Sequence, residues 1–267
     1  MERSIAEALL NVLEARRGII AVVGAGGKKT TLSRLLEAHC ALGTKGIALT
    51  TTVQMAPPSM IANMTGCIAE AEEIVAKVGS LQRNDEAQRS DGAALIAAPS
   101  AKPNRLAGLP PDLIGPIHET GRFNVSLVKA DGARMRLIKA PSDHEPALPT
   151  GTTTLLPIVS ARAFGKPLSP RLAHRAERLS AVIDAPLDTI LAPIHIARLL
   201  SHRNGALRAA GDAKIVPIIN MADAQDRLDA SIEAARLALA LTDRFDQVVV
   251  ASMTEKAPVL EVISQQP

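Results

Sequence analysis

The sequence has no Trp or Tyr and only 3 Phe among its 267 residues. Proteins that bind single-stranded nucleic acid usually stack the bases on aromatic side chains, and this chain has almost none to offer. Its charges also nearly balance, with 30 Lys and Arg against 27 Asp and Glu and a net charge of +3. So small an excess indicates neither a nucleic-acid surface nor a membrane surface. We therefore expect neither nucleic acid nor a membrane among the partners.

Cysteines and long apolar runs are scarce as well. Cys40 and Cys67 lie far apart and form no CxxC pair, which argues against a disulfide framework and a cysteine zinc site. No apolar run approaches the length that spans a membrane. Near the N-terminus, Ile5, Leu9 and Leu13 fall on one helical face among charged residues, which is typical of an amphipathic helix and not of a signal peptide. We expect a globular protein of the reducing cytoplasm.

The chain is organised around residues 22–32, which read VVGAGGKKTTL. An apolar strand, Ile19–Val23, precedes the glycines, and a helical pattern from Leu32 to Cys40 follows them and stops at Gly43. A strand, a glycine turn, a lysine and a helix in this order are the context of a phosphate-binding loop.

Each residue of this turn has a role in such a loop. Gly24, Gly26 and Gly27 leave room for backbone N–H groups to wrap a phosphate, and the helix N-terminus adds partial positive charge. Lys28 would then reach the terminal phosphates of a nucleotide. The alternative is a glycine-rich turn that only packs a helix against a strand.

The match to the pattern GxxxxGK[ST] depends on the frame. With Lys28 as the motif lysine, Val22 takes the first glycine position and Lys29 the position of the magnesium-binding hydroxyl. With Lys29 as the motif lysine, Thr30 supplies the hydroxyl but Lys28 replaces the last glycine. Lys29, Thr30 and Thr31 all remain candidates for contact with the nucleotide, and Thr30 for contact with Mg²⁺.

Two further strands are predicted to end in polar residues. Residues 45–52 form a strand that ends in Thr50-Thr51-Thr52, so the Thr51 hydroxyl is a candidate ligand of Mg²⁺ or of the γ-phosphate; threonines that merely favour the strand are the alternative. Residues 123–130 form an apolar strand followed by Asp131 and Gly132. A carboxylate at a strand end can hold Mg²⁺, and the glycine lets the backbone follow the γ-phosphate.

Residues 122–146 combine basic side chains with a turn. Lys129, Arg134 and Arg136 surround Asp131 and favour an anion site over a solvated charge run. The turn Pro141–Pro146 frames Asp143, His144 and Glu145, which are suited to acid–base or metal chemistry but also occur in exposed turns.

Near the C-terminus, Asn220 and Asp223 follow an apolar strand and are similar to the guanine-reading motif NKxD, with Met221 in place of the lysine. The alternative is a helix cap, since Asp is common at helix starts.

These patterns predict one P-loop NTPase-like α/β domain over residues 1–267, with a mainly parallel sheet flanked by helices. Besides the elements above, we expect helices at residues 69–81, 170–183 and 194–200 and after Asp223, and strands at residues 92–98, 153–159, 214–219, 248–251 and 259–263.

Taken together, the motifs resemble the YqeC family of selenium-dependent hydroxylase accessory proteins. The likeness spans five segments in order: Val23–Leu32 to VGAGGKT, Thr50–Met55 to TTTTKM, Lys129–Pro146 to EADGAKGRPLKAPAEHEP, Ala163–Leu168 with His174-Arg175 to GKPL and HR, and Asn220–Asp223 to NKxD.

The resemblance implies an ATP- or GTP-binding protein that acts in maturation of a molybdenum hydroxylase, with that enzyme or its cofactor-maturation proteins as partners. It also implies catalytic roles for Lys28, Asp131 and His144. Lys29 and Lys129 stand where the family has Thr and Glu, so we expect an NTPase with a weakened Mg²⁺ site. Two alternatives remain open: a small-molecule kinase that uses residues 122–146 as its acceptor site, and a nucleotide-dependent scaffold that does not hydrolyse.

Overall fold

The computed structural model describes residues 1–58, 64–85 and 92–265. The chain divides into two compact units that interleave along the sequence. The first contains Met1–Val22, Thr31–Ala130 and Ala147–Thr154, and the second contains Val23–Thr30, Asp131–Pro146 and Leu155–Pro267. The boundaries fall inside strand β1 (Gly18–Gly24), helix α2 (Lys28–Ala41) and strand β8 (Thr152–Ser160). The prediction of a single nucleotide-binding domain stays a prediction.

The first unit is built on a parallel sheet in the order β1-β6-β2-β4-β3. Its central strands, β2 (Ile47–Thr51) and β6 (Val125–Lys129), are buried at every residue, including their polar side chains Thr50, Thr51, Ser126 and Lys129. The other strands are β3 (Met64–Ile68), β4 (Ala93–Pro99) and β5 (Leu106–Ala107), which pairs antiparallel with β4.

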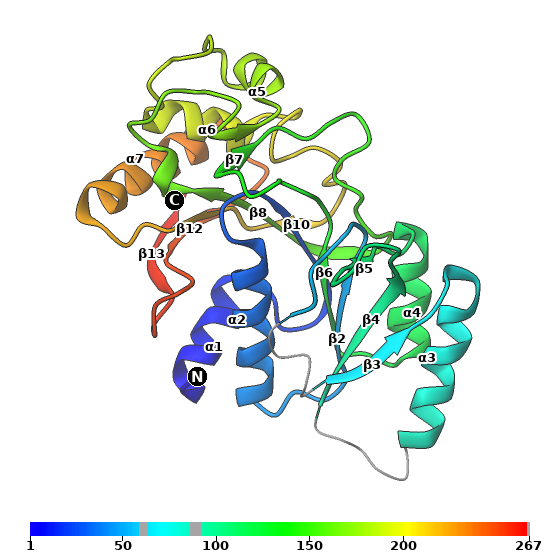
Figure 1. Ribbon diagram of the computed structural model, residues 1–267. Helices are drawn as coiled ribbons and strands as arrows, with labels where there is room; N and C mark the ends of the chain where they lie inside the picture. Colours follow the sequence, from blue (N-terminus) through cyan, green and yellow to red (C-terminus); the bar gives the residue numbers. More distant parts are fainter. Residues whose placement is uncertain (59–63, 86–91, 266–267) are drawn as a thin grey trace. The chain divides into compact units, whose positions relative to one another are not determined.

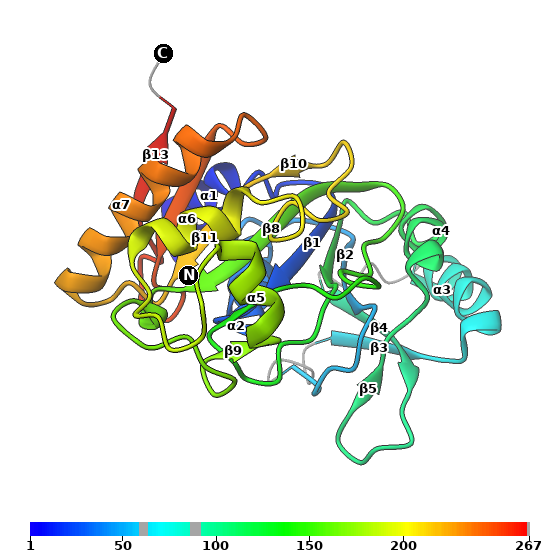
Figure 2. The ribbon, with the colours of Figure 1, turned by 90° about the horizontal axis from the view of Figure 1, so that it is seen from above.

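Helices α1 (Arg3–Val12), α3 (Ala71–Asp85) and α4 (Ile114–Thr120), with the short 3-10 helix η2 (Pro111–Leu113), complete the first unit. Helices α3 and α4 lie side by side (Figures 1 and 2). Ile74 of α3 and Ile114 of α4 are fully buried in one apolar cluster with Ile96 of β4, so burial of apolar surface holds these helices on the sheet.

The second unit has its own sheet segment in the order β13-β12-β11-β8. Strands β11 (Ile218–Asn220) and β12 (Gln247–Ala251) are parallel to each other, and β11 is parallel to β8; β13 (Val259–Ser264) is antiparallel. Strand β10 (Lys214–Ile215) pairs with β8, and β7 (Ile138–Lys139) pairs with β9 (Ala173–His174). The remaining elements are η3 (Ala161–Ala163), α5 (Ala176–Ile183), α6 (Pro193–Ser201) and α7 (Gln225–Leu241). Helix α6 packs against α5 and α7, and α7 packs on β12 and β13 (Figure 2).

This architecture confirms the predicted α/β class with a mainly parallel sheet flanked by helices, and it is compatible with a P-loop NTPase-like fold. Two predicted elements were wrong in extent. The helix expected over residues 170–183 begins only at Ala176, because β9 and the left-handed Arg175 (φ 63°) precede it. The strand expected over residues 214–219 is interrupted at Pro217, which has no N–H to donate to a strand ladder. None of the helices in the described part of the chain is long and apolar enough to cross a membrane.

Candidate functional site

The glycine loop, residues 24–27, lies against the carboxyl ends of β8 and β11. The N–H of Ala25 donates to Ile158 O at 2.8 Å. A Cβ on Gly24 (φ +88°) would lie 2.2 Å from Ile158 O, and a Cβ on Gly27 (φ +124°) 2.2 Å from Asn220 Nδ2. Both positions therefore require glycine for packing and for backbone conformation, whatever the loop binds.

Asn220 ties this loop to the neighbouring strand end. Its side chain is buried; Nδ2 donates to Gly26 O at 2.8 Å, and Oδ1 accepts from Met253 N at 3.0 Å. Both ends of the amide are thus engaged by main chain, which fixes the loop on the sheet edge where open parallel sheets bind ligands.

Lys28 and Asp131, predicted to share a site, lie together. Lys28 is the first residue of α2, and its Nζ lies 2.8 Å from Asp131 Oδ1 while also donating to Gly24 O. The other oxygen, Asp131 Oδ2, accepts from Gly24 N at 2.8 Å. Burial lowers the pKa of Lys28, and the charge of Asp131 opposes that shift. Lys28 is therefore held beside the glycine loop by the buried carboxylate of Asp131.

The ion pair continues into a network of five residues. Lys139 Nζ lies 2.9 Å from Asp131 Oδ2 and donates to Glu145 Oε2 and to Gly132 O at 2.7 Å each. Arg175 Nη1 donates to the same Glu145 oxygen at 2.7 Å. We call Lys28, Asp131, Lys139, Glu145 and Arg175 the charge network. Its three cations outnumber its two carboxylates, so it carries one excess positive charge beside the glycine loop.

This arrangement strongly shifts the pKa of Glu145. Burial raises the pKa of its carboxyl, but hydrogen bonds and charge attraction from Lys139 and Arg175 outweigh burial and lower the pKa to about 2. The carboxylate is therefore ionised at every physiological pH and acts as a fixed link between the two cations.

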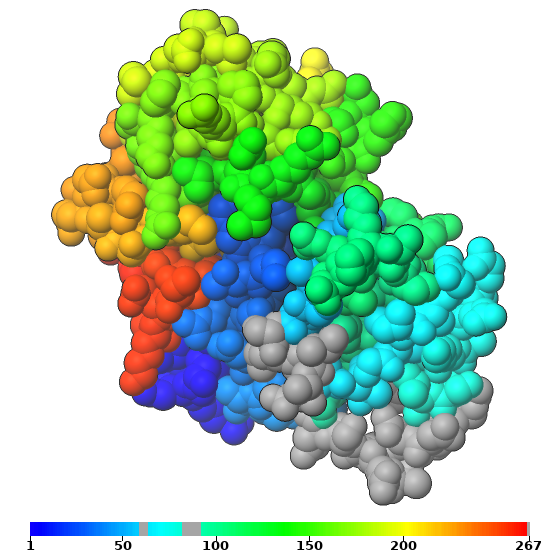
Figure 3. All heavy atoms as spheres, in the orientation of Figure 1, coloured from blue at the N-terminus to red at the C-terminus, as the bar shows by residue number. Residues whose placement is uncertain are grey.

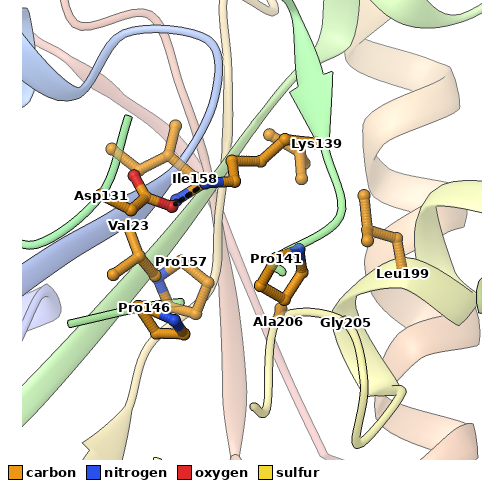
Figure 4. A pocket seen from close by; sticks show the side chains of 12 residues that line it. Val23, Asp131, Lys139, Pro141, Pro146, Pro157, Ile158, Leu199, Gly205 and Ala206 are labelled. Atoms are coloured by element: carbon orange, nitrogen blue, oxygen red, sulfur yellow. Dashed lines mark hydrogen bonds and ion pairs between the residues drawn. The ribbon is translucent and has the colours of Figure 1, made fainter. Parts of the chain in front are cut away.

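An apolar pocket adjoins the charge network. In Figure 4, Asp131 and Lys139 pair at one side of this pocket, and proline rings form much of the rest. Its lining consists of Val23, Gly24, Asp131, Lys139, Pro141, Pro146, Pro157, Ile158, Val159, Leu199, Gly205 and Ala206. Its volume is about 30 Å³, which leaves room for water-sized groups only.

The other candidates at the start of α2 differ in exposure. Lys29 is exposed, Thr30 is half-buried and Thr31 is buried. Thr51 belongs to the first unit, where its hydroxyl donates to Val53 O at 2.7 Å and to Lys129 O at 3.0 Å. Contact of these residues with nucleotide or metal stays a prediction.

The remaining candidates lie outside the charge network. His144 is exposed on the loop that carries Glu145. Asp223 Oδ2 accepts from Arg227 Nη2 at 3.0 Å. Both ends of the Asn220 amide bind main-chain atoms, so recognition of a base in this region would depend on Asp223. Such recognition stays a prediction.

Sequence reasoning did not single out Lys139 or the pairing of Arg175. Residues 122–139 were predicted to be basic around Asp131, but Lys139 reaches that carboxylate through the two-residue strand β7, which is too short to leave a pattern. Asp131 and Glu145 were a usable signal for cationic partners in this region, because buried carboxylates need such partners.

The residues present do not fit a resident divalent metal. Both oxygens of Asp131 face ammonium groups, at 2.8 Å from Lys28 and 2.9 Å from Lys139. Among the residues that the structure places, no group of three or more His, Cys, Asp or Glu side chains could hold a metal ion. Mg²⁺ that arrives together with a nucleotide is a separate case, which this geometry does not test, and it stays a prediction.

A glycine loop between strand and helix, a lysine at the helix start and an aspartate after the adjacent parallel strand are features of P-loop-type α/β proteins. The chain belongs to the YqeC family, since residues 20–177 match the family described as YqeC protein. A protein of Escherichia coli (strain K12) named "Uncharacterized protein YqeC" is 26% identical over 195 residues, which cover 73% of this chain and 72% of that protein. The predicted resemblance is thus confirmed. All five residues of the charge network lie within the matched range, and Asn220 lies beyond it.

Proposed function

We propose that this protein binds a nucleoside triphosphate at the glycine loop and uses it as an accessory protein in enzyme maturation. The observation that carries the proposal is the placement of Lys28 at the start of α2, against Asp131 and beside Gly24. A phosphate group arriving at the helix N-terminus would replace Asp131 as the partner of Lys28, and the excess positive charge of the network favours such an anion.

The decisive test is a thermal-shift titration with ATP, GTP and their diphosphates, in the parent protein and in Lys28→Ala. A ligand at one hundred times its dissociation constant adds about 2.7 kcal/mol to the free energy of unfolding, which a melting curve resolves. We expect Lys28→Ala to abolish this stabilisation, because a charge-assisted contact to the phosphates is lost.

Lys29→Ala is the matched control, since Lys29 is the exposed neighbour on the same helix turn. It should retain nucleotide binding. Unchanged stabilisation by every nucleotide in Lys28→Ala would refute the phosphate-binding role of the loop, and loss in Lys29→Ala alone would shift that role to Lys29.

The client in this proposal is a selenium-dependent molybdenum hydroxylase or one of its cofactor-maturation proteins, as the sequence resemblance implies. Activity of that hydroxylase in cells carrying Lys28→Ala in place of the parent protein tests this part. Full hydroxylase activity would rule out a nucleotide-dependent role in maturation.

A small-molecule kinase that uses residues 122–146 as its acceptor site is a second candidate, favoured by the excess positive charge of the charge network, which would attract an anionic acceptor. A kinase would consume nucleotide only when an acceptor is bound, whereas an NTPase would turn over alone. Nucleotide binding without turnover under either condition would indicate a scaffold.

A further inference from the structure

A second cavity of the second unit lies outside the charge network. It is formed between the loop carrying Asp143, helix α5 and the segment that follows α6, and its volume is about 210 Å³. Helix α5 contributes to the exposed surface of this unit (yellow-green in Figure 3). The polar side chains of the cavity are Asp143, Arg178, His202, Asn204 and Arg208.

Two guanidinium groups converge on Asp143. Arg178 reaches it with both terminal nitrogens, at 3.1 Å from Nη1 to Oδ1 and 2.9 Å from Nη2 to Oδ2. Arg208 Nη2 donates to the main-chain O of Asp143 at 3.1 Å and lies 3.5 Å from Oδ1. Two positive charges therefore face one negative charge in this cavity.

Asp143 is a surface group, with 69% of its side chain exposed, whereas the side chains of Arg178 and Arg208 are 37% and 26% exposed. Ion pairs this exposed are weak because water screens them and competes for the same atoms. The carboxylate can therefore leave the two arginines at little cost, while the arginines stay beside the cavity.

The cavity also holds neutral polar groups. His202 Nδ1 accepts from Asn204 N at 3.0 Å, which leaves the proton of a neutral ring on Nε2 as a donor. Asn204 Oδ1 accepts from Arg208 Nη1 at 3.3 Å and so restrains that guanidinium.

We propose that this cavity binds the phosphate group of a phosphorylated small molecule, and that Asp143 occupies the position of that phosphate in the free protein. A phosphate dianion has the charge to neutralise both arginines and enough oxygens for both guanidinium groups and for His202. A carboxylate has too little charge and too few oxygens to do the same. The site goes beyond the proposed function, because it does not depend on binding of a nucleotide at the glycine loop.

The test uses inorganic phosphate as the probe, titrated by calorimetry at constant ionic strength into the full chain. Lys28→Ala serves as the background throughout, so that the glycine loop does not contribute. In this background, Asp143→Asn should bind phosphate more tightly, by about threefold or more, because the internal competitor is lost. Adding Arg178→Gln or Arg208→Gln should abolish the gain, and acetate at the same ionic strength should bind more weakly than phosphate.

A gain of affinity cannot come from damage to the fold, so Asp143→Asn keeps the test meaningful even if an arginine variant is unstable. Equal or weaker phosphate binding in Asp143→Asn would overturn the proposal. So would a gain that survives loss of both arginines, or acetate binding as tightly as phosphate.

Discussion

Glu145 connects two cations through a single oxygen, with Lys139 and Arg175 both 2.7 Å from Oε2. Removing its charge would leave Arg175 without its carboxylate partner and Lys139 with Asp131 alone. The cost of such a change exceeds that of a surface pair, because desolvated charges cannot recover full hydration.

We therefore predict that Glu145→Gln lowers the free energy of unfolding at pH 7 by about 2 kcal/mol, a value discounted for partial solvent screening. The folded-state pKa of about 2 lies below the ordinary value of 4.5. A depressed pKa stabilises the fold above pH 4.5, and this contribution is lost as the pH falls from 4.5 towards 2. Urea denaturation at several pH values measures it: the gap between parent and variant should shrink across that window.

Glu37→Gln is the control, since Glu37 forms a solvent-accessible pair with Arg34 on one helix face and should change stability by under about 0.5 kcal/mol. A Glu145→Gln protein as stable as the parent at pH 7 would contradict a linking role for this carboxylate.

The role of a residue could be predicted from sequence only where its neighbours along the chain define it. Lys28 was recognisable because glycines precede it and a helix follows, and Asp131 because it ends an apolar strand. Lys139 was not, since its ammonium reaches Asp131 and Glu145 only after the chain has folded back through β7 and β9. The lysines that the sequence favoured differ in placement: Lys29 is exposed, and Lys129 donates to Gln54 O within the first unit.

At the scale of elements, the buried parallel strands were the most predictable parts. Strand β1 carries a continuous apolar run, and β2 and β6 are mostly apolar, because both faces of these strands are covered. Helix α4 escaped prediction because it lies in a proline-rich stretch, with Pro116 inside its first turn, where proline costs no hydrogen bond. The start of α5 escaped prediction because Arg175 adopts a left-handed backbone without glycine, whereas the predicted end at residue 183 was correct.

The glycine loop is an element whose shape depends on Asn220. We predict that Asn220→Ala destabilises the protein by about 2 kcal/mol, because Gly26 O and Met253 N each lose a buried partner. Affinity for ATP and GTP should fall together, since the loop itself is loosened. Chemical denaturation and calorimetric titration with both nucleotides measure these effects.

Asp223→Asn is the matched comparison on the same segment. Asp223 pairs with Arg227 near the surface, so stability should change by less than about 0.5 kcal/mol. If Asp223 reads a guanine edge, this variant should lose a modest preference for GTP that the parent shows. Equal competition by ATP and GTP in the parent would leave Asp223 as the partner of Arg227 alone.

At the scale of the whole molecule, the site draws on three separated stretches of chain. The glycine loop, residues 131–146 and the chain after residue 155 all belong to the second unit. The family match over residues 20–177 contains the entire charge network, whereas Arg208 of the second cavity lies beyond that range. The matched range thus includes Asp143 of the second cavity but neither of its arginines, Arg178 and Arg208.

A nucleotide that binds only the folded protein would stabilise the whole fold, so a metal requirement can be read from global unfolding. Lys139 places an ammonium group 2.9 Å from the carboxylate that would otherwise attract Mg²⁺. At an effective dielectric constant of about 20, two unit charges 4 Å apart interact by about 4 kcal/mol, so this cation both repels Mg²⁺ and replaces part of its charge. We predict that the parent binds nucleotide nearly as well in EDTA as in Mg²⁺ and hydrolyses it slowly, since no firmly held metal supports the developing charge.

Lys139→Met should restore metal dependence while retaining the buried aliphatic stem. We expect nucleotide affinity of this variant to be at least about tenfold higher in Mg²⁺ than in EDTA, because Asp131 Oδ2 then keeps only the Gly24 N–H as partner and has a lone pair available for the metal. Lys129→Met is the comparison variant, because the sequence placed Lys129 and not Lys139 among the cations that weaken the Mg²⁺ site. The ammonium of this buried lysine binds Gln54 O in the first unit, so we expect its loss to leave metal dependence unchanged. Calorimetry and melting curves with and without EDTA measure the metal dependence of nucleotide binding in the three proteins. A parent protein that binds only with Mg²⁺ would mean that Thr30 or Thr31 supplies the ligand and that Lys139 serves only to hold Asp131 and Glu145 in place.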